Sequence, residues 1–242
     1  MSSFSDSVVT AVALISSGDA MLWAIVLRSL AVSATACVLA CSLGLALGAW
    51  LAVARFPGRP LVLTLLNTSL AVPSVVVGLV IYLLLSRSGP LGFLGWLFSF
   101  QAMVLAQTLL VLPLVTALTR QVVEDSDREH GEQFTSLGAR PGLRSLLMAW
   151  DERYALLTVV ITAFGRAVSE VGAVMIVGGN IDGFTRVMTT AIALETSKGD
   201  LPLALGLGII LLGVVLLLNG AVALLRRWRE HLDGGDLRMA TT

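Results

Sequence analysis

Two oppositely charged residues, Arg166 and Glu170, lie inside an otherwise uncharged apolar run that covers residues 155–177. A charge at the centre of a bilayer costs about 2.5–3.5 kcal/mol on insertion scales, and charges retained there face the interior of a helix bundle. The spacing of the two residues is one helical turn, so the charges can neutralise each other. Two interpretations stay open: an ion pair that fixes the orientation of the helix, or part of a translocation path or its gate.

Small and hydroxyl-bearing residues in two of the apolar runs are candidates for the lining of such a path. A hydroxyl group donates a hydrogen bond to an anion without adding a fixed charge. Transport also requires binding weak enough to allow release. For each serine or threonine, ordinary helix packing is the alternative. The predicted path or gate residues are Thr68, Ser69, Ser74, Gly78, Arg166, Ser169, Glu170 and Gly172.

Residues with the spacing of a catalytic, nucleotide-binding or metal-binding site are missing from the sequence. There is no Gly-x4-Gly-Lys-Ser/Thr loop, no Gly-x-Ser-x-Gly elbow and no His-Glu-x-x-His helix. His130 and His231 lie in separate polar segments, and Cys37 and Cys41 lie one helical turn apart in an apolar run, as small packing residues do. We therefore expect no catalytic, cofactor or metal site. A formal net charge of zero gives no indication of nucleic-acid binding.

Most of the chain consists of apolar runs long enough to cross a membrane. Hydrophobic residues make up 56% of it and charged residues 13%, against roughly 25% charged in average soluble domains. About 20 apolar residues of helix span the hydrocarbon core, where a helix satisfies its own backbone. The sequence predicts an all-α fold, a polytopic membrane bundle of five transmembrane helices with kinks at Pro73 and Pro113, from the runs 22–53, 61–85, 94–118, 155–177 and 203–225.

Basic residues are distributed unevenly between the segments outside these runs. Eleven arginines lie between runs one and two, between runs three and four, and after run five, whereas the other segments hold three basic residues. The positive-inside rule predicts a cytoplasmic C-terminus and an extracytoplasmic N-terminus, and an odd number of spans agrees. Residues 1–21 are then an extracytoplasmic segment whose apolar part, 8–15, forms an interfacial helix. Residues 22–225 form the transmembrane domain, and residues 226–242 form a cytoplasmic tail.

The long polar stretch between spans three and four, residues 120–153, has the pattern of two helices joined by a tight turn. A polar helical stretch is expected to end near Leu137, where Gly138 suits the left-handed position past a helix end. Pro141 suits the first turn of the next helix. One face of that helix carries, at helical spacing, Leu143, Leu146, Leu147 and Trp150. The pattern predicts an elbow that docks into a groove on a partner; a solvated loop is the alternative.

The same stretch resembles the cytoplasmic signature of binding-protein-dependent ABC importer permeases. That signature reads Glu-Ala-Ala, three residues, Gly, nine residues, Ile, one residue, Leu-Pro. Glu132 and Gly138 match at the right spacing and Met148 stands in for the isoleucine, whereas the sequence departs from the signature at Gln133, Phe134, Trp150 and Asp151. In that family the segment forms coupling helices that fit a cleft on the ATPase subunit. The resemblance implies ATPase-coupling roles for Glu132, Gln133, Phe134, Gly138 and Ala139.

Two further stretches are similar to permeases for molybdate, tungstate and sulfate. Residues 67–79 resemble their second-span signature, and residues 166–181 resemble the hallmark that follows their coupling loop. The amino-acid sequence of residues 166–181, together with that of residues 189–199, looks closest to the tungstate-type branch of these permeases. Over about residues 20–225, the resemblance implies a type I ABC importer permease fold in the cell (inner) membrane. It also implies a homodimer, two ATPase subunits that bind ATP and Mg²⁺, and an extracytoplasmic oxyanion-binding protein.

The expected function is therefore ATP-driven import of a tetrahedral oxyanion, tungstate first, molybdate second and sulfate as the runner-up. The sequence does not separate tungstate from molybdate, because the two anions are nearly the same size and charge. A secondary anion transporter or channel without an ATPase is an alternative that inverted repeats would favour, and no clear internal repeat is found. A membrane-embedded enzyme is a further alternative. It would need a nucleophile–base pair or a set of metal ligands, and the sequence shows neither.

Overall fold

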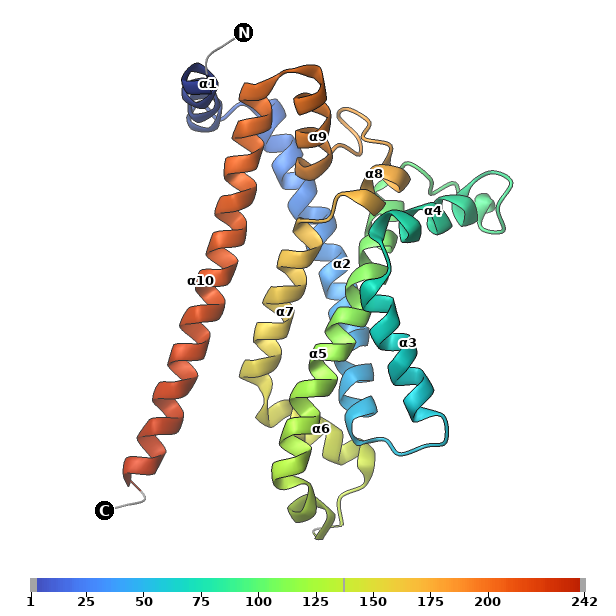
Figure 1. Cartoon of the computed structure of the whole chain (residues 1–242), viewed down its shortest axis with the longest axis vertical. Helices are drawn as coiled ribbons and strands as arrows, with labels where there is room; N and C mark the ends of the chain where they lie inside the picture. Colours follow the sequence, from blue (N-terminus) through green and yellow to red (C-terminus); the bar gives the residue numbers. More distant parts are fainter. Residues whose placement is uncertain (1–3, 137, 240–242) are drawn as a thin grey trace.

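Three long apolar helices run between the two ends of the molecule (Figure 1). They are α2 (Ala20–Val53), α5 (Phe100–Ser136) and α10 (Leu201–Met239) in a computed structural model that describes residues 4–136 and 138–239. The carboxylate of Asp19 begins α2 by accepting a hydrogen bond from the backbone N–H of Leu22, at 2.8 Å. All regular elements among the described residues are helical, as the sequence predicts.

Two further spans are bent pairs of shorter helices. α3 (Arg59–Ala71) and α4 (Ser74–Leu85) meet at 99°, and α7 (Arg153–Val168) and α8 (Gly172–Gly178) meet at 56°. Counting each pair as one span gives the predicted five. The kink expected at Pro73 is a sharp break, because proline lacks an N–H and holds the preceding Val72 in an extended conformation.

The third span differs from its predicted limits. It begins at Phe100 rather than at residue 94, because residues 86–99 form turns and a short 3₁₀ segment, η1 (Gly92–Leu94), that ends in a left-handed Gly95. At its other end, the polar stretch expected as a separate helix continues the span without interruption to Ser136. Pro113 lies inside this continuous helix. The transmembrane span and the first arm of the predicted elbow are therefore one rigid element.

The remaining helices lie at the two ends of the bundle (Figure 1). The short α1 (Phe4–Ser16) and α9 (Met188–Lys198) lie at one end, and α6 (Pro141–Asp151) lies at the other. The three arginine-rich segments all fall at the α6 end, which we call the arginine-rich end. The chain thus alternates between its ends in the order that the charge distribution predicts.

Glycine residues, which have no side chain, let α2 and α5 approach closely. A Cβ atom added to Gly44 of α2 would lie 2.8 Å from Cγ1 of Val115, and one added to Gly48 would lie 2.6 Å from the carbonyl oxygen of Thr116. Both contacts are with α5, so these glycines hold α2 and α5 together within the chain. Cys37 and Cys41 are free, buried thiols beside the same interface, as expected of packing residues.

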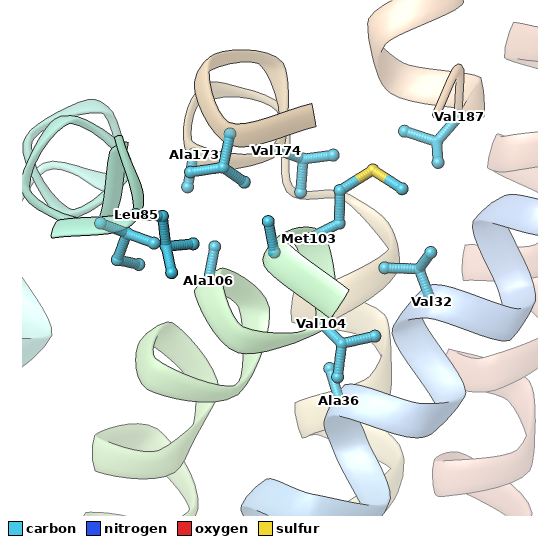
Figure 2. Packing of buried hydrophobic residues seen from close by; sticks show 12 residues of the cluster. Val32, Ala36, Leu85, Met103, Val104, Ala106, Ala173, Val174 and Val187 are labelled. Atoms are coloured by element: carbon cyan, nitrogen blue, oxygen red, sulfur yellow. The ribbon is translucent and has the colours of Figure 1, made fainter. Parts of the chain in front are cut away.

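An apolar cluster anchors the short halves of the bent spans to the long helices (Figure 2). Figure 2 shows side chains from α2, α4, α5 and α8, together with the residue that precedes α9, pointing toward one another. The labelled members are Val32, Ala36, Leu85, Met103, Val104, Ala106, Ala173, Val174 and Val187. Burial of these groups positions α4 and α8 although each is too short to span by itself.

We expect cysteines introduced at the exposed Ser88 and Ser197 to react with a membrane-impermeant maleimide from outside intact cells. A cysteine at the exposed Ser136 should react only after the membrane is opened, because it lies at the arginine-rich end. The measurement is labelling of variants in which the buried Cys37 and Cys41 are first replaced by alanine. Labelling at position 136 in intact cells would contradict the predicted orientation.

Candidate translocation site and coupling surface

The charged pair predicted from the sequence forms where α7 breaks from α8. Nη1 of Arg166 donates to Oε2 of Glu170 at 2.8 Å. The other carboxylate oxygen, Oε1, accepts a hydrogen bond from the backbone N–H of Ala173, in the first turn of α8, at 3.2 Å. Backbone N–H groups in a first turn have no partner within their own helix. The carboxylate of Glu170 therefore joins the end of one half-helix to the start of the other.

The two members of the pair differ in exposure. The side chain of Glu170 is 4% exposed, whereas that of Arg166 is 49% exposed. Both had been expected to face the interior of the bundle. The expectation is confirmed for Glu170 and is wrong for Arg166 within a single chain, because the helix ends before residue 170 and turns only the carboxylate inward. A half-exposed guanidinium in a span needs water or another chain beside it.

Two side chains from other helices hold the backbone of the break. Nε2 of Gln107, on α5, donates to the carbonyl oxygen of Ala167 at 2.9 Å, and Oγ1 of Thr189, on α9, donates to the carbonyl oxygen of Glu170 at 2.7 Å. Both donors are buried. Neither side chain was predicted from the sequence to act here. The available signal was a polar side chain inside an apolar helix, since such a group requires a partner.

The predicted residues Ser74, Gly78 and Gly172 meet at the contact between α4 and α8. A Cβ atom on Gly78 would lie 2.7 Å from Cα of Ala173, and one on Gly172 would lie 2.8 Å from Oγ of Ser74. The absence of side chains at these glycines therefore lets the two short helices touch backbone to backbone. The structure thus brings two predicted residues of α4 against the first turn of α8, which lies about a hundred residues further along the chain.

The other predicted hydroxyl residues are placed differently. Thr68 and Ser69 lie on α3 and donate to carbonyl oxygens of their own helix, at 2.8 Å and 2.6 Å. No hydrogen bond among the described residues joins them to the charged pair. Ser169 lies in the break and is exposed. The break therefore exposes one guanidinium and one hydroxyl group.

A polar network fixes the loop between α8 and α9. Buried Arg186 lies 3.2 Å from Asp182 and 3.8 Å from buried Glu195, which Lys198 also contacts at 3.0 Å. Arg28 of α2 donates to two carbonyl oxygens of the same loop, at 2.7 Å and 3.2 Å. This network was not predicted from the sequence. Because Thr189 follows the loop, the network also positions the donor that holds the break.

The elbow at the other end has the predicted geometry. Gly138 has a left-handed conformation with φ of 75°, and Pro141 occupies the first turn of α6. The expected helix end at Leu137 lies outside the described residues. Met148 is fully buried against α2 and α5, and Phe134 packs on the same cluster. Glu132, Gln133 and Gly138 are exposed and Ala139 is partly exposed; their coupling role stays a prediction.

The opposite face of α6 is apolar and uncovered. The four apolar side chains predicted to share this face are exposed: Leu143 by 52%, Leu146 by 66%, Leu147 by 38% and Trp150 by 69%. Contiguous exposed apolar groups mark interaction surfaces. We call these four residues the α6 face. Since Met148 anchors the helix from its other side, the α6 face is presented rigidly at the arginine-rich end.

Ion pairs connect α6 and α3 to α5. Nε of Arg144, on α6, donates to Oδ1 of Asp127 at 2.6 Å. The guanidinium group fits there because Gly131 has no side chain: a Cβ atom on Gly131 would collide with Nη2 of Arg144. Glu124 accepts from Arg59 at 2.5 Å and from Arg120 at 2.6 Å. The pairs that join two helices were not predicted, because their partners lie 17 and 65 residues apart in the sequence.

Comparison with known proteins identifies the family of this chain. Residues 44–231 match the family described as binding-protein-dependent transport system inner membrane component. The chain belongs to this family. The permease is 40% identical to a probable anion ABC transporter permease protein of Haloferax volcanii, over 87% of this chain and 91% of the relative. It is 41% identical to the tungstate uptake system permease protein TupB of Peptoclostridium acidaminophilum, over 88% and 93%. The sulfate transport system permease protein CysW of Escherichia coli is 38% identical over 57% and 50%.

Membership confirms the predicted type I ABC importer permease fold and the location in the membrane. A permease of this family associates with an ATPase and with a binding protein, and is not itself an enzyme. The two alternatives, a secondary transporter without an ATPase and a membrane enzyme, receive no support. The broken spans, the charged pair and the α6 face can now be interpreted as parts of an importer.

Replacing Arg166 of the permease with glutamine should lower its thermal unfolding midpoint, because the buried carboxylate of Glu170 loses its cation. Removing one partner of a fully buried pair costs about 3–5 kcal/mol, and the exposure of Arg166 reduces this effect. The double variant Arg166→Gln/Glu170→Gln should recover stability, since an amide oxygen can still accept from Ala173. The measurement is unfolding of the purified protein, with Arg87→Gln, an exposed loop arginine, as control. Equal losses in the single and double variants would contradict mutual neutralisation.

Proposed function

We propose that this permease imports a tetrahedral oxyanion, with tungstate as its first substrate and molybdate as its second. The observation that carries the proposal is the likeness to the TupB tungstate permease across 88% of this chain and 93% of the relative. A second TupB protein, of Campylobacter jejuni, is 42% identical over 67% of this chain. Sulfate permeases are less identical, at 38% over 57% of this chain and at 32% over 67%, which makes sulfate the weaker candidate.

The break between α7 and α8 is the proposed contact with the anion. The guanidinium of Arg166 is half-exposed, and its fork of donors fits an oxyanion. Glu170, 2.8 Å away, competes with the anion for that guanidinium, so the anion binds weakly and is released. The exposed hydroxyl of Ser169 adds an uncharged donor. Thr68, Ser69, Ser74, Gly78 and Gly172 complete the proposed lining or gate.

The path requires a second copy of the chain. In one chain the Arg166 side chain is 49% exposed within a span, where lipid would leave its charge unsolvated. A homodimer that faces its two breaks toward each other would enclose both guanidinium groups in one aqueous path. In this arrangement α4 and α8 line a path between two copies. Such a role does not require either helix to cross the membrane, for which both are too short.

The α6 face is the proposed contact with the ATPase. Its four exposed apolar side chains suit the helix-in-groove mode of recognition, in which an apolar helix face fills a cleft. Two ATPase subunits, one for each copy of the permease, would bind ATP and Mg²⁺. An extracytoplasmic binding protein would deliver the anion at the end that carries α1 and α9. Since α5 continues from the span to Ser136 and Arg144 of α6 pairs with Asp127 of α5, a movement of α6 would be transmitted to the bundle.

The test is ATP-dependent uptake by the permease reconstituted with its ATPase and binding protein. Labelled tungstate, molybdate and sulfate are compared in parallel vesicles. We expect tungstate uptake to exceed molybdate uptake and both to exceed sulfate uptake. Uptake of an amino acid, a sugar or a metal cation, with none of the oxyanions, would overturn the substrate and leave the family assignment intact.

Replacement of Leu146 and Trp150 with serine should release the ATPase without unfolding the permease. Both side chains are more than 60% exposed, so their removal creates no cavity. Loss of two apolar anchors in an interface weakens binding by about tenfold or more. The measurement is the amount of ATPase that co-purifies with the permease in detergent. Leu212→Ser, an equally exposed position on α10, is the control, and unchanged co-purification of the double variant would exclude α6 from the contact.

A further inference from the structure

A polar cavity of about 210 Å³ lies at the arginine-rich end, between the α2–α3 turn, α5 and α6. Four of its nine lining residues are arginines, and a wider neighbouring depression shares three of them and Asp127. The charged residues of the cavity are Arg55, Arg59, Arg128, Arg144, Glu124 and Asp127. The charged pair of the proposed path lies elsewhere in the fold, so the mechanism above leaves this cavity without a role.

The charges around the cavity do not balance. Four arginines face two carboxylates, which leaves two positive charges. Guanidinium groups stay protonated in proteins, so the excess cannot be relieved by loss of a proton. Both carboxylates are already engaged: Glu124 accepts from Arg59 and Arg120, and Asp127 accepts from Arg144. The surplus positive charge is therefore available to an anion.

Two of the arginines provide this surplus. Arg55 forms no ion pair among the residues that the structure describes. Arg128 pairs with Asp125 at 3.3 Å, but the two side chains are 77% and 61% exposed, and exposed pairs of this kind contribute little. Both guanidinium groups are therefore free to turn toward a ligand in the cavity.

The rest of the cavity wall is held in place. Arg59 donates to the carbonyl oxygen of Leu51 through both Nε and Nη2, at 3.3 Å and 3.2 Å, in addition to its pair with Glu124. Arg144 fills space that exists only because Gly131 has no side chain. A preorganised wall lowers the entropy lost on binding.

We propose that this cavity binds a tetrahedral oxyanion group of the phosphate type, held by Arg55 and Arg128. Arginine presents paired donors that match a phosphate, and the net positive charge excludes a metal cation. The volume suffices for one such group with several waters, each of which takes about 30 Å³ in the liquid. Because the cavity lies just beyond the apolar spans, the group can belong to an anionic phospholipid or to a free inorganic anion. The inference does not rest on the proposed transport substrate.

The test compares the full-length wild-type permease with Arg55→Gln/Arg128→Gln. The control, Arg87→Gln/Arg140→Gln, removes two exposed arginines that do not line the cavity. In one arm, delipidated protein in detergent is titrated with inorganic phosphate while its thermal unfolding is followed. In the other arm, native mass spectrometry counts the phosphatidylglycerol and phosphatidylcholine molecules that each variant retains.

In at least one arm we expect the cavity variant to bind about tenfold more weakly than the wild type, the effect of losing about 1.4 kcal/mol. The control should match the wild type. A response to phosphate assigns the site to a free anion, whereas a difference confined to phosphatidylglycerol assigns it to a lipid headgroup. Equal behaviour of wild type and cavity variant in both arms would overturn the proposal, as would an equal loss in the control.

Discussion

The buried carboxylate of Glu170 sets the constraint on which the middle of this bundle depends. A carboxylate at 4% exposure requires a cation and hydrogen-bond donors, and here they come from both sides of a helix break. Arg166 supplies the charge from α7, and the N–H of Ala173 supplies a donor from α8. The break is thus both the reason the carboxylate can be buried and the place where the span exposes a guanidinium group.

Breaking two of five spans leaves backbone groups that lipid cannot satisfy. At the break between α7 and α8, side chains from other helices bond to two of these groups. Gln107 donates to the carbonyl oxygen of Ala167, and Thr189 donates to that of Glu170. Glycines at the contact of α4 and α8 then let the two short helices stack. The outer loop network positions Thr189, so that the outer surface, the break and the bundle core are mechanically connected.

Different interactions hold the two ends of the molecule in a fixed conformation. At the arginine-rich end, α6 is clamped from one side by buried Met148 and by the Arg144–Asp127 pair, which leaves its apolar face free for a partner. At the opposite end, buried Arg186 and Glu195 hold a loop rather than a helix. Both arrangements hold an end of the bundle in a fixed conformation.

The sequence by itself determined the number of spans, their alternation between the two ends and the elbow at Gly138 and Pro141. Apolar length, arginine placement and glycine or proline conformation are local properties that can be read along the chain. Tertiary structure decided which half of a span turns aside, which hydroxyls approach Glu170, and that Thr68 and Ser69 bond to their own helix instead. Those outcomes depend on remote partners, 60 residues apart for Gln107 and Ala167 and about a hundred for Ser74 and Gly172. Periodicity along one helix does not specify which remote side chain will bond to a freed backbone group.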